Sequence, residues 1–239
     1  MKRLGILYPP CGAEFEYYRY GEMLGNDVRI NLMGVRIHGG DDEHAPENLS
    51  RTGEIANLSL SARVLRHLEP DAAIWACTSG SFVDGLGHAR AQVDALSREL
   101  ECPATSTSLA FASALQHLGI DTVSILASYP EKTASRFFNL LSDCGIRTHA
   151  YRCLDIDSGP AAADLEQDAV LAACRDLDIP GDAALLIPDT AIPTMHWIAP
   201  LEAQLERPVL TANQVSLWDT ARLAAVPTPA TLPGRLFGG

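Results

Sequence analysis

The chain has 239 residues, a formal net charge of −12 and 47% hydrophobic residues, which is long enough for a sizeable core and near the size at which chains divide into two subdomains. The acidic balance argues against nucleic acid or an anionic membrane as partner, because both need a basic surface. It does not argue against a small carboxylate substrate, which a few local N–H donors can hold.

The six cysteines form no CxxC pair and have no spacing typical of a zinc site, so free thiols in a reducing compartment are expected. No apolar run approaches membrane-spanning length, and Met1-Lys-Arg-Leu leads directly into a predicted strand instead of a signal peptide. We therefore expect a cytoplasmic protein. The sequence leaves the oligomeric state open, with a homo-oligomer as one alternative.

In the first half, short apolar runs predict parallel strands, and the spacing between them predicts amphipathic helices. The strands are expected at residues 2–8, 28–35, 71–76 and 104–107, and the helices at 49–68, 82–100 and 109–118. The polar loop 36–48, with Gly39-Gly40-Asp41-Asp42-Glu43-His44, resembles a metal site only superficially, because metal ligands need a fixed geometry. A mobile lid or solvated surface is the interpretation that we favour.

The second half repeats this alternation. Strands are expected at residues 121–127, 147–153, 183–187 and 208–211, and helices at 128–144, 162–177, 192–205 and 214–225. Asp182-Ala-Ala-Leu-Leu-Ile187 repeats Asp71-Ala-Ala-Ile-Trp-Ala76, which indicates an internal duplication. We predict an α/β fold of two Rossmann-like parallel-sheet subdomains about a pseudo-twofold axis, with the active site in the cleft between them. Residues 1–112 with 215–239 would form the first half, and residues 113–214 the second.

Cys77 is the strongest catalytic candidate. It follows a buried strand, and chemistry in open α/β sheets collects beyond the carboxyl ends of strands. The amides of Thr78, Ser79 and Gly80 would lie at a helix N-terminus, where they favour an anion and lower the pKa of a thiol. The alternative is a buried structural thiol.

The equivalent loop of the second half is Pro188-Asp189-Thr190. Asp189 is a candidate acid or base, and the alternative is a helix N-cap. Tyr129 and Thr190 also follow strands, and they would offer donors to a substrate carboxylate or only cap helices. Pro10 and Cys11 follow the first strand, which has no glycine fingerprint for a dinucleotide. Cys11 would line the same pocket or pack as an unreactive thiol.

Several motifs resemble the Asp/Glu racemase superfamily, in the branch of maleate cis-trans isomerase and arylmalonate decarboxylase. They are Gly5-Ile-Leu-Tyr-Pro-Pro10, Cys77-Thr-Ser-Gly-Ser-Phe82, Ala127-Ser-Tyr129, Thr190-Ala191, Pro208-Val-Leu-Thr-Ala-Asn-Gln214 with Trp218, and Gly234-Arg-Leu-Phe237. The resemblance implies one catalytic cysteine at Cys77, no metal and no organic cofactor. It places carboxylate donors at Thr78, Ser79 and Tyr129. The second cysteine of the family is absent, and Asp189 takes its position.

The leading hypothesis is a cofactor-independent isomerase or racemase of a small carboxylate or dicarboxylate. Cys77 would act as nucleophile or base, and Asp189 as the opposing acid or base, since such reactions need one group on each side of a planar intermediate. A decarboxylase of a substituted malonate is the alternative within the enzyme class. A catalytically retired carboxylate-binding protein is the alternative outside it.

Overall fold

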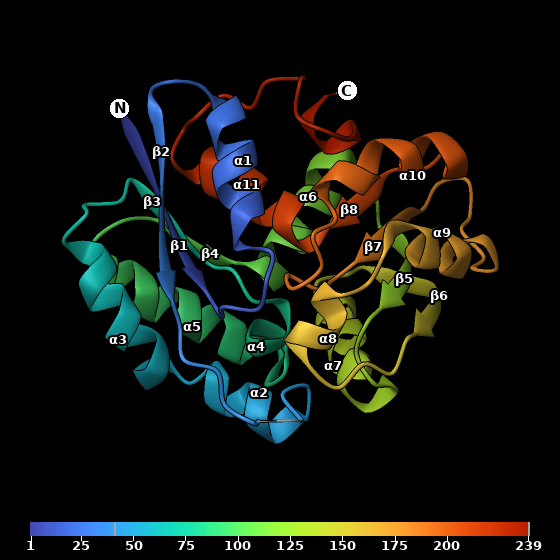
Figure 1. Ribbon diagram of the computed structural model, residues 1–239, viewed down its shortest axis with the longest axis horizontal. Coiled ribbons are helices and arrows are strands. Elements are labelled where there is room, and N and C mark those ends of the chain that lie inside the picture. The colour runs from blue at the N-terminus through green and yellow to red at the C-terminus, as the bar shows by residue number, and fades with distance from the viewer. Residues whose placement is uncertain (41, 239) are drawn as a thin grey trace.

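The computed structural model describes residues 1–40 and 42–238 and contains two four-stranded parallel sheets (Figure 1). The first has the order β2-β1-β3-β4, built from β1 (Lys2–Tyr8), β2 (Val28–Gly34), β3 (Ala72–Trp75) and β4 (Ala104–Ser106). The second has the order β6-β5-β7-β8, built from β5 (Thr122–Ala127), β6 (Arg147–Cys153), β7 (Ala184–Ile187) and β8 (Val209–Thr211). The same order in both halves confirms the predicted α/β class with two Rossmann-like subdomains.

Helices follow the strands in both halves. The first half contains α1 (Glu14–Gly21), α2 (Pro46–Thr52), α3 (Ile55–Arg66), α4 (Thr78–Phe82), α5 (Gly85–Leu100) and α6 (Thr107–Leu118). The second contains α7 (Glu131–Asp143), α8 (Gly159–Ala163), α9 (Gln167–Arg175) and α10 (Ile198–Leu205), and α11 (Ala212–Leu223) follows β8 and packs back on the first sheet. Three short 3₁₀ segments are η1 (Glu22–Leu24), η2 (Met195–Trp197) and η3 (Arg235–Phe237). None of the helices in the described ranges is long and apolar enough to cross a membrane.

The predicted helix 49–68 is wrong as a single helix, because the chain breaks at Gly53 between α2 and α3. A Cβ atom at Gly53 would lie 2.2 Å from the carbonyl oxygen of Gly80. The two backbones therefore approach each other more closely than any side chain permits.

Three further helices also differ from the prediction. The helix expected at 82–100 begins as α5 at Gly85, whose φ is +82°, and a separate short helix, α4, precedes it. The helix expected at 162–177 is split into α8 and α9. The helix expected at 192–205 begins only at Ile198, because Pro193 disfavours the helical conformation for Ile192 before it.

The largest hydrophobic core continues across both halves. Alternate residues of β1, such as Leu4 and Ile6, point into this core with α1, α6 and α11, whereas Leu7 points to a smaller core with α3 and α5. The inner residues of β5 and β7, such as Ile125 and Leu186, join the same large core. Figure 1 shows α3 and α5 on one side of the first sheet and α1, α6 and α11 on the other. The division at residues 112 and 214 stays a prediction.

Candidate active site

Loops at the carboxyl ends of the strands enclose a cavity of about 40 Å³ between the two halves. Its walls are Pro9, Cys11, Ile37, Glu43, His44, Leu49, Thr52, Cys77 and Ser79 from the first half, and Gly159, Asp189, Thr190 and Ala191 from the second. The structure thus brings together five predicted site residues: Cys11, Cys77, Ser79, Asp189 and Thr190. A larger open groove beside α3 and α5 contains none of them.

Three predicted residues do not line this cavity. Pro10 is exposed at the surface, and its neighbour Pro9 forms the wall instead. Thr78 and Tyr129 are buried immediately behind the wall. The Thr78 hydroxyl has no hydrogen-bond partner within the described ranges, and the Tyr129 hydroxyl donates to the Pro188 carbonyl at 2.9 Å. Thr78 stands between the wall residues Cys77 and Ser79, and Tyr129 reaches the Asp189 loop through its hydrogen bond to Pro188.

Cys77 lies between β3 and α4 and is only 4% exposed. Its sulfur accepts a hydrogen bond from the Gly80 N–H at 3.3 Å, and the Ser79 hydroxyl lies 3.7 Å away. Burial nevertheless raises the pKa of the Cys77 thiol to about 11, because desolvation of a thiolate outweighs these donors. The expected lowering of its pKa is therefore wrong. A five-residue helix supplies too little compensation for complete burial.

Asp189 follows β7 at the position equivalent to that of Cys77 after β3. Its Oδ1 accepts the Ala191 N–H at 2.9 Å, and its Oδ2 accepts a short hydrogen bond from the Ser128 hydroxyl. No helix begins here, since residues 190 and 191 form a turn. The helix-cap alternative is therefore replaced by a turn cap. The carboxylate is buried, and it stands on the second-half side of the cavity.

Cys11 and Thr190 meet through Tyr8. The Cys11 thiol donates to the Tyr8 hydroxyl at 3.3 Å, and that hydroxyl donates to the Thr190 carbonyl at 2.8 Å. Burial and the nearby Asp189 and Cys77 raise the pKa of the Cys11 thiol well above its ordinary value. Cys11 is thus a neutral wall residue that connects, through Tyr8, the first loop of one half to the Asp189 loop of the other.

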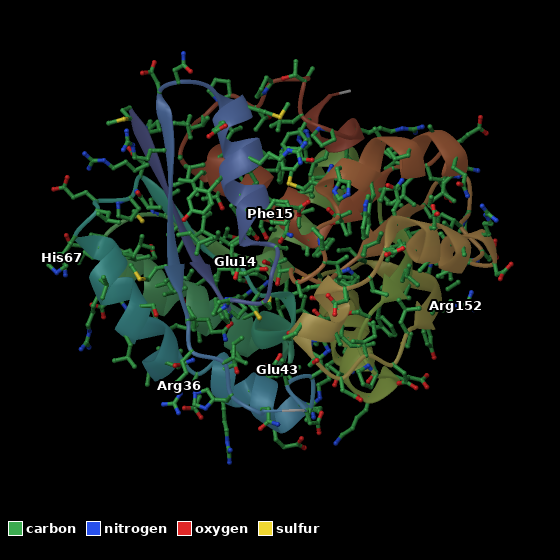
Figure 2. All side chains as sticks on the ribbon, in the orientation of Figure 1. Glu14, Phe15, Arg36, Glu43, His67 and Arg152 are labelled. Carbon is green, nitrogen blue, oxygen red and sulfur yellow. The ribbon has the colours of Figure 1, made fainter. Side chains whose placement is uncertain are left out.

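Sequence reasoning missed Glu43 and His44, which it assigned to a lid or solvated surface. His44 is 4% exposed, and both residues line the cavity. Glu43, labelled in Figure 2, accepts the Gly159 N–H at the start of α8 at 3.0 Å. The neighbouring Asp41 lies outside the described residues. This loop forms hydrogen bonds with residues of the second half, and no pattern in the sequence predicts them.

A second missed residue is Glu16 in α1. It is fully buried, its Oε1 accepts the Met195 N–H at 2.8 Å, and its Oε2 accepts from the Asn213 side chain at 2.8 Å. Asn213 also accepts from the Tyr17 hydroxyl at 3.0 Å, so its side chain is fully used inside the fold. Glu16 thus holds the segment that continues from the Asp189 loop.

No set of three histidine, cysteine, aspartate or glutamate side chains in residues 1–40 and 42–238 is arranged to hold a metal ion. The ionisable side chains around the cavity are Cys11, Glu43, His44, Cys77 and Asp189, with no lysine or arginine. An anionic ligand would therefore depend on hydrogen-bond donors and on the histidine.

A family model for arylmalonate decarboxylase matches residues 47–237, which is most of the chain and includes the loops of Cys77 and Asp189. The chain belongs to the arylmalonate decarboxylase family. No curated protein matches the sequence. The family match covers Cys77 and Asp189 but begins after the cavity residues Glu43 and His44.

Solved structures of decarboxylases and isomerases share the fold. A doubly substituted arylmalonate decarboxylase in its liganded form is 22% identical over 99% of both chains, with a TM-score of 0.84. A maleate isomerase variant from Pseudomonas putida S16, solved with maleate, is 20% identical over 100% of this chain and 98% of its own, with a TM-score of 0.88. A Nocardia farcinica maleate cis-trans isomerase mutant carrying a covalent succinylcysteine intermediate is 20% identical over 99% and 98%, with a TM-score of 0.89.

Proposed function

We propose that this member of the arylmalonate decarboxylase family is a cofactor-independent isomerase or racemase of a small carboxylate or dicarboxylate. The observation that carries the proposal is the placement of Cys77 and Asp189 in one cavity, each from the equivalent loop of its half. Two proton-handling or nucleophilic groups on opposite walls suit a reaction that reaches both faces of a planar intermediate or a double bond.

The substrate carboxylate would be held where donors already converge. The Ser79 backbone and hydroxyl, the unpartnered Thr78 hydroxyl and the Tyr129 phenol surround Cys77. A buried carboxylate is stable only when its oxygens receive such hydrogen bonds. Thr190, Pro10 and Cys11 complete the set of residues proposed to contact or border the substrate.

Covalent chemistry at a cysteine is consistent with the fold relatives. The Nocardia isomerase mutant holds a succinylcysteine intermediate after another of its cysteines was changed to serine. Cys77 would play the corresponding part here, as nucleophile or base. Asp189 would then accept or deliver the proton on the opposite side.

Decarboxylation of a substituted malonate is the second candidate, and the family match favours it. Loss of CO₂ leaves a carbanion that needs one protonating group, and Cys77 or Asp189 would supply it. A retired binding protein is the remaining alternative. It would bind carboxylates without exchanging their protons.

The test is solvent-deuterium incorporation followed by NMR across amino acids, maleate, hydroxy acids and substituted malonates. A racemase incorporates deuterium without losing carbon, and a cis-trans isomerase converts the olefinic signals of one isomer into those of the other, with or without deuterium. A decarboxylase releases CO₂ and deuterates the product. Binding without either reaction would favour the retired protein and contradict the proposal.

Asp189→Asn tests the two-sided mechanism on whichever substrate reacts. An asparagine oxygen still accepts the Ala191 N–H, and the Ser128 hydroxyl can turn to accept from its amide, so the turn should persist. An amide moves no proton at useful rates, so turnover should fall by about 100-fold or more while the melting temperature is unchanged. A fully active Asp189→Asn protein would leave single-cysteine chemistry at Cys77.

A further inference from the structure

His44 belongs to the first half of the chain, but its hydrogen bonds are made with residues of the second half. Its Nδ1 lies 2.7 Å from the Ile156 carbonyl oxygen, its N–H donates to the Asp157 carbonyl at 2.8 Å, and its own carbonyl accepts from the Thr133 hydroxyl at 2.7 Å. Its ring packs edge-on against Tyr129, with the ring centroids 4.8 Å apart. The main chain and the ring of His44 are therefore both held in place, unlike those of a solvated loop residue.

These contacts decide which ring nitrogen is available. A carbonyl oxygen only accepts, so the Nδ1 that faces Ile156 carries the proton. In the neutral ring, Nε2 then holds the lone pair. Within the described ranges Nε2 makes no hydrogen bond, although His44 is a wall residue of the cavity that contains Cys77.

The other acids of the cavity already accept hydrogen bonds. Glu43 accepts from the Gly159 N–H, and Asp189 accepts from Ala191 and Ser128. Cys77, in contrast, keeps its proton because burial raises its pKa to about 11, so it needs an acceptor before it reacts near neutral pH. A neutral imidazole with a free nitrogen is the group best suited to that transfer.

We propose that His44 Nε2 is the proton acceptor for the Cys77 thiol. In the described residues the two groups border the same cavity without a direct hydrogen bond, so the proton passes through one water molecule or after a small movement of the side chains. The S–H bond breaks, an N–H bond forms at Nε2, and the net products are a thiolate and an imidazolium. The Ile156 carbonyl holds the Nδ1 proton, and the carboxylates of Glu43 and Asp189 on the same cavity stabilise the positive ring. The remaining titratable groups around the ring are Cys11 and Tyr129, both neutral there.

This inference rests on the proposed function only in taking Cys77 as the reacting group. Its test is therefore a reaction that needs no substrate: alkylation of Cys77 by iodoacetamide, resolved by site with mass spectrometry, from pH 6 to pH 10. The decisive variant is His44→Asn, because the asparagine amide can still donate to the Ile156 carbonyl but has no basic nitrogen. His38→Asn is the matched control, since His38 belongs to the same loop and does not line the cavity.

We expect His44→Asn to slow the alkylation of Cys77 about tenfold or more at pH 7, and the difference between the two rates to narrow toward pH 10, as the thiol begins to ionise without help. His38→Asn should follow the wild type throughout. An unchanged or faster reaction of Cys77 in His44→Asn at pH 7 would overturn the proposal.

A second variant distinguishes the loss of the imidazole base from a displacement of the loop that carries it. Thr133→Val removes the donor to the His44 carbonyl but keeps the imidazole. Alkylation should then stay within about threefold of the wild type. A loss as large as that of His44→Asn would show that the loop contacts matter and not the imidazole. Absence of turnover on every carboxylate, with these alkylation results intact, would reject the proposed function and not the role of His44.

Discussion

The sulfur of Cys77 accepts a backbone hydrogen bond from Gly80 and lies 3.7 Å from the Ser79 hydroxyl. A serine at this position keeps the acceptor for the Gly80 N–H, so α4 should form as before. The hydroxyl, however, is a far weaker acid and nucleophile than a thiol near neutral pH.

We therefore expect Cys77→Ser to abolish turnover with little change in melting temperature, measured on the substrate found by deuterium exchange. Cys174→Ser is the control, because Cys174 is equally buried but packs in the core beside α9, away from the cavity. Cys174→Ser should cost about 1–3 kcal/mol of stability and leave the kinetics per folded molecule unchanged. A strong kinetic effect of Cys174→Ser alone would mean that another cysteine reacts.

Tyr129 contributes a ring and a hydroxyl with separate tasks. The ring packs edge-on against His44 and Phe82, and phenylalanine preserves both contacts. Tyr129→Phe removes the hydrogen bond to the Pro188 carbonyl and the proposed carboxylate donor. The donor is worth on the order of 1.5–3 kcal/mol when the acceptor is charged. Steady-state kinetics should show kcat/KM lower by about 10- to 100-fold. Tyr151→Phe, which removes an exposed hydroxyl bonded to Glu131, should change nothing. Equal kinetic constants for the two variants would mean that Tyr129 contributes only its packing and does not bind the substrate.

At the level of elements, the contact between Gly53 and Gly80 connects the α2–α3 break with the loop that carries Cys77. The Gln92 side chain donates to both carbonyls, at 2.6 Å to Gly53 and 2.9 Å to Gly80. A methyl group at Gly53 would collide with the Gly80 carbonyl oxygen and must displace α4.

Gly53→Ala should therefore destabilise the fold by about 1–3 kcal/mol, as overpacking does, and also lower activity per folded molecule. Gly87→Ala is the matched control, because Gly87 lies in α5 and a Cβ atom there meets open space. That change should stabilise the protein by about 0.5–1 kcal/mol. Urea unfolding measures both. Similar free energies of unfolding for the two variants would contradict the close approach.

The helices and strands differ in how well the sequence predicts them. The predicted strands agree with all eight strands of the described residues to within about two residues. Buried strands such as β3, β5 and β7 leave a continuous hydrophobic signal, whereas the edge strands β2 and β6 are partly exposed. The break at Gly53 depends on a tertiary contact, and the late start of α10 at Ile198 follows Pro193. The apolar spacing continues through both positions, so it does not indicate either break. Helix α1 carries aromatic residues such as Tyr17 and Tyr20 beside buried Glu16, so its sequence lacks a simple amphipathic pattern.

Site residues divide in the same way. The internal repeat predicts that Cys77 and Asp189 belong to equivalent loops, and the structure places both on one cavity. The raised pKa of Cys77 and the hydrogen bonds of His44 depend on burial and on distant partners, so local sequence does not contain them.

For the molecule as a whole, Glu16 joins the two halves through a carboxyl whose burial raises its pKa from 4.5 to about 7. Between pH 4.5 and pH 7 the native state keeps a proton that the unfolded state releases, so stability falls as pH rises through this window. Arg19 and the His196 ring, 4.0 Å from Oε1, are the nearest basic groups.

Glu16→Gln should remove this decline, which amounts to at most about 3 kcal/mol. Free energies of unfolding in urea at pH 5, 6, 7 and 8 measure it. Glu22→Gln, at an exposed position just after α1, should keep the wild-type slope. Parallel curves for Glu16→Gln and the wild type would mean that Glu16 is ionised across the whole range.

The small volume of the cavity limits how fast substrate can enter and product can leave. About 40 Å³ accommodates roughly three water molecules, which is less space than a four-carbon dicarboxylate occupies. Substrate entry and product release must therefore displace part of the wall, and the three hydrogen bonds of His44 to the second half join its two sides. Exchange of ligand is then gated by the protein's own fluctuations, so turnover responds to solvent viscosity, and deuterium exchange at the His44 amide reports the frequency of opening.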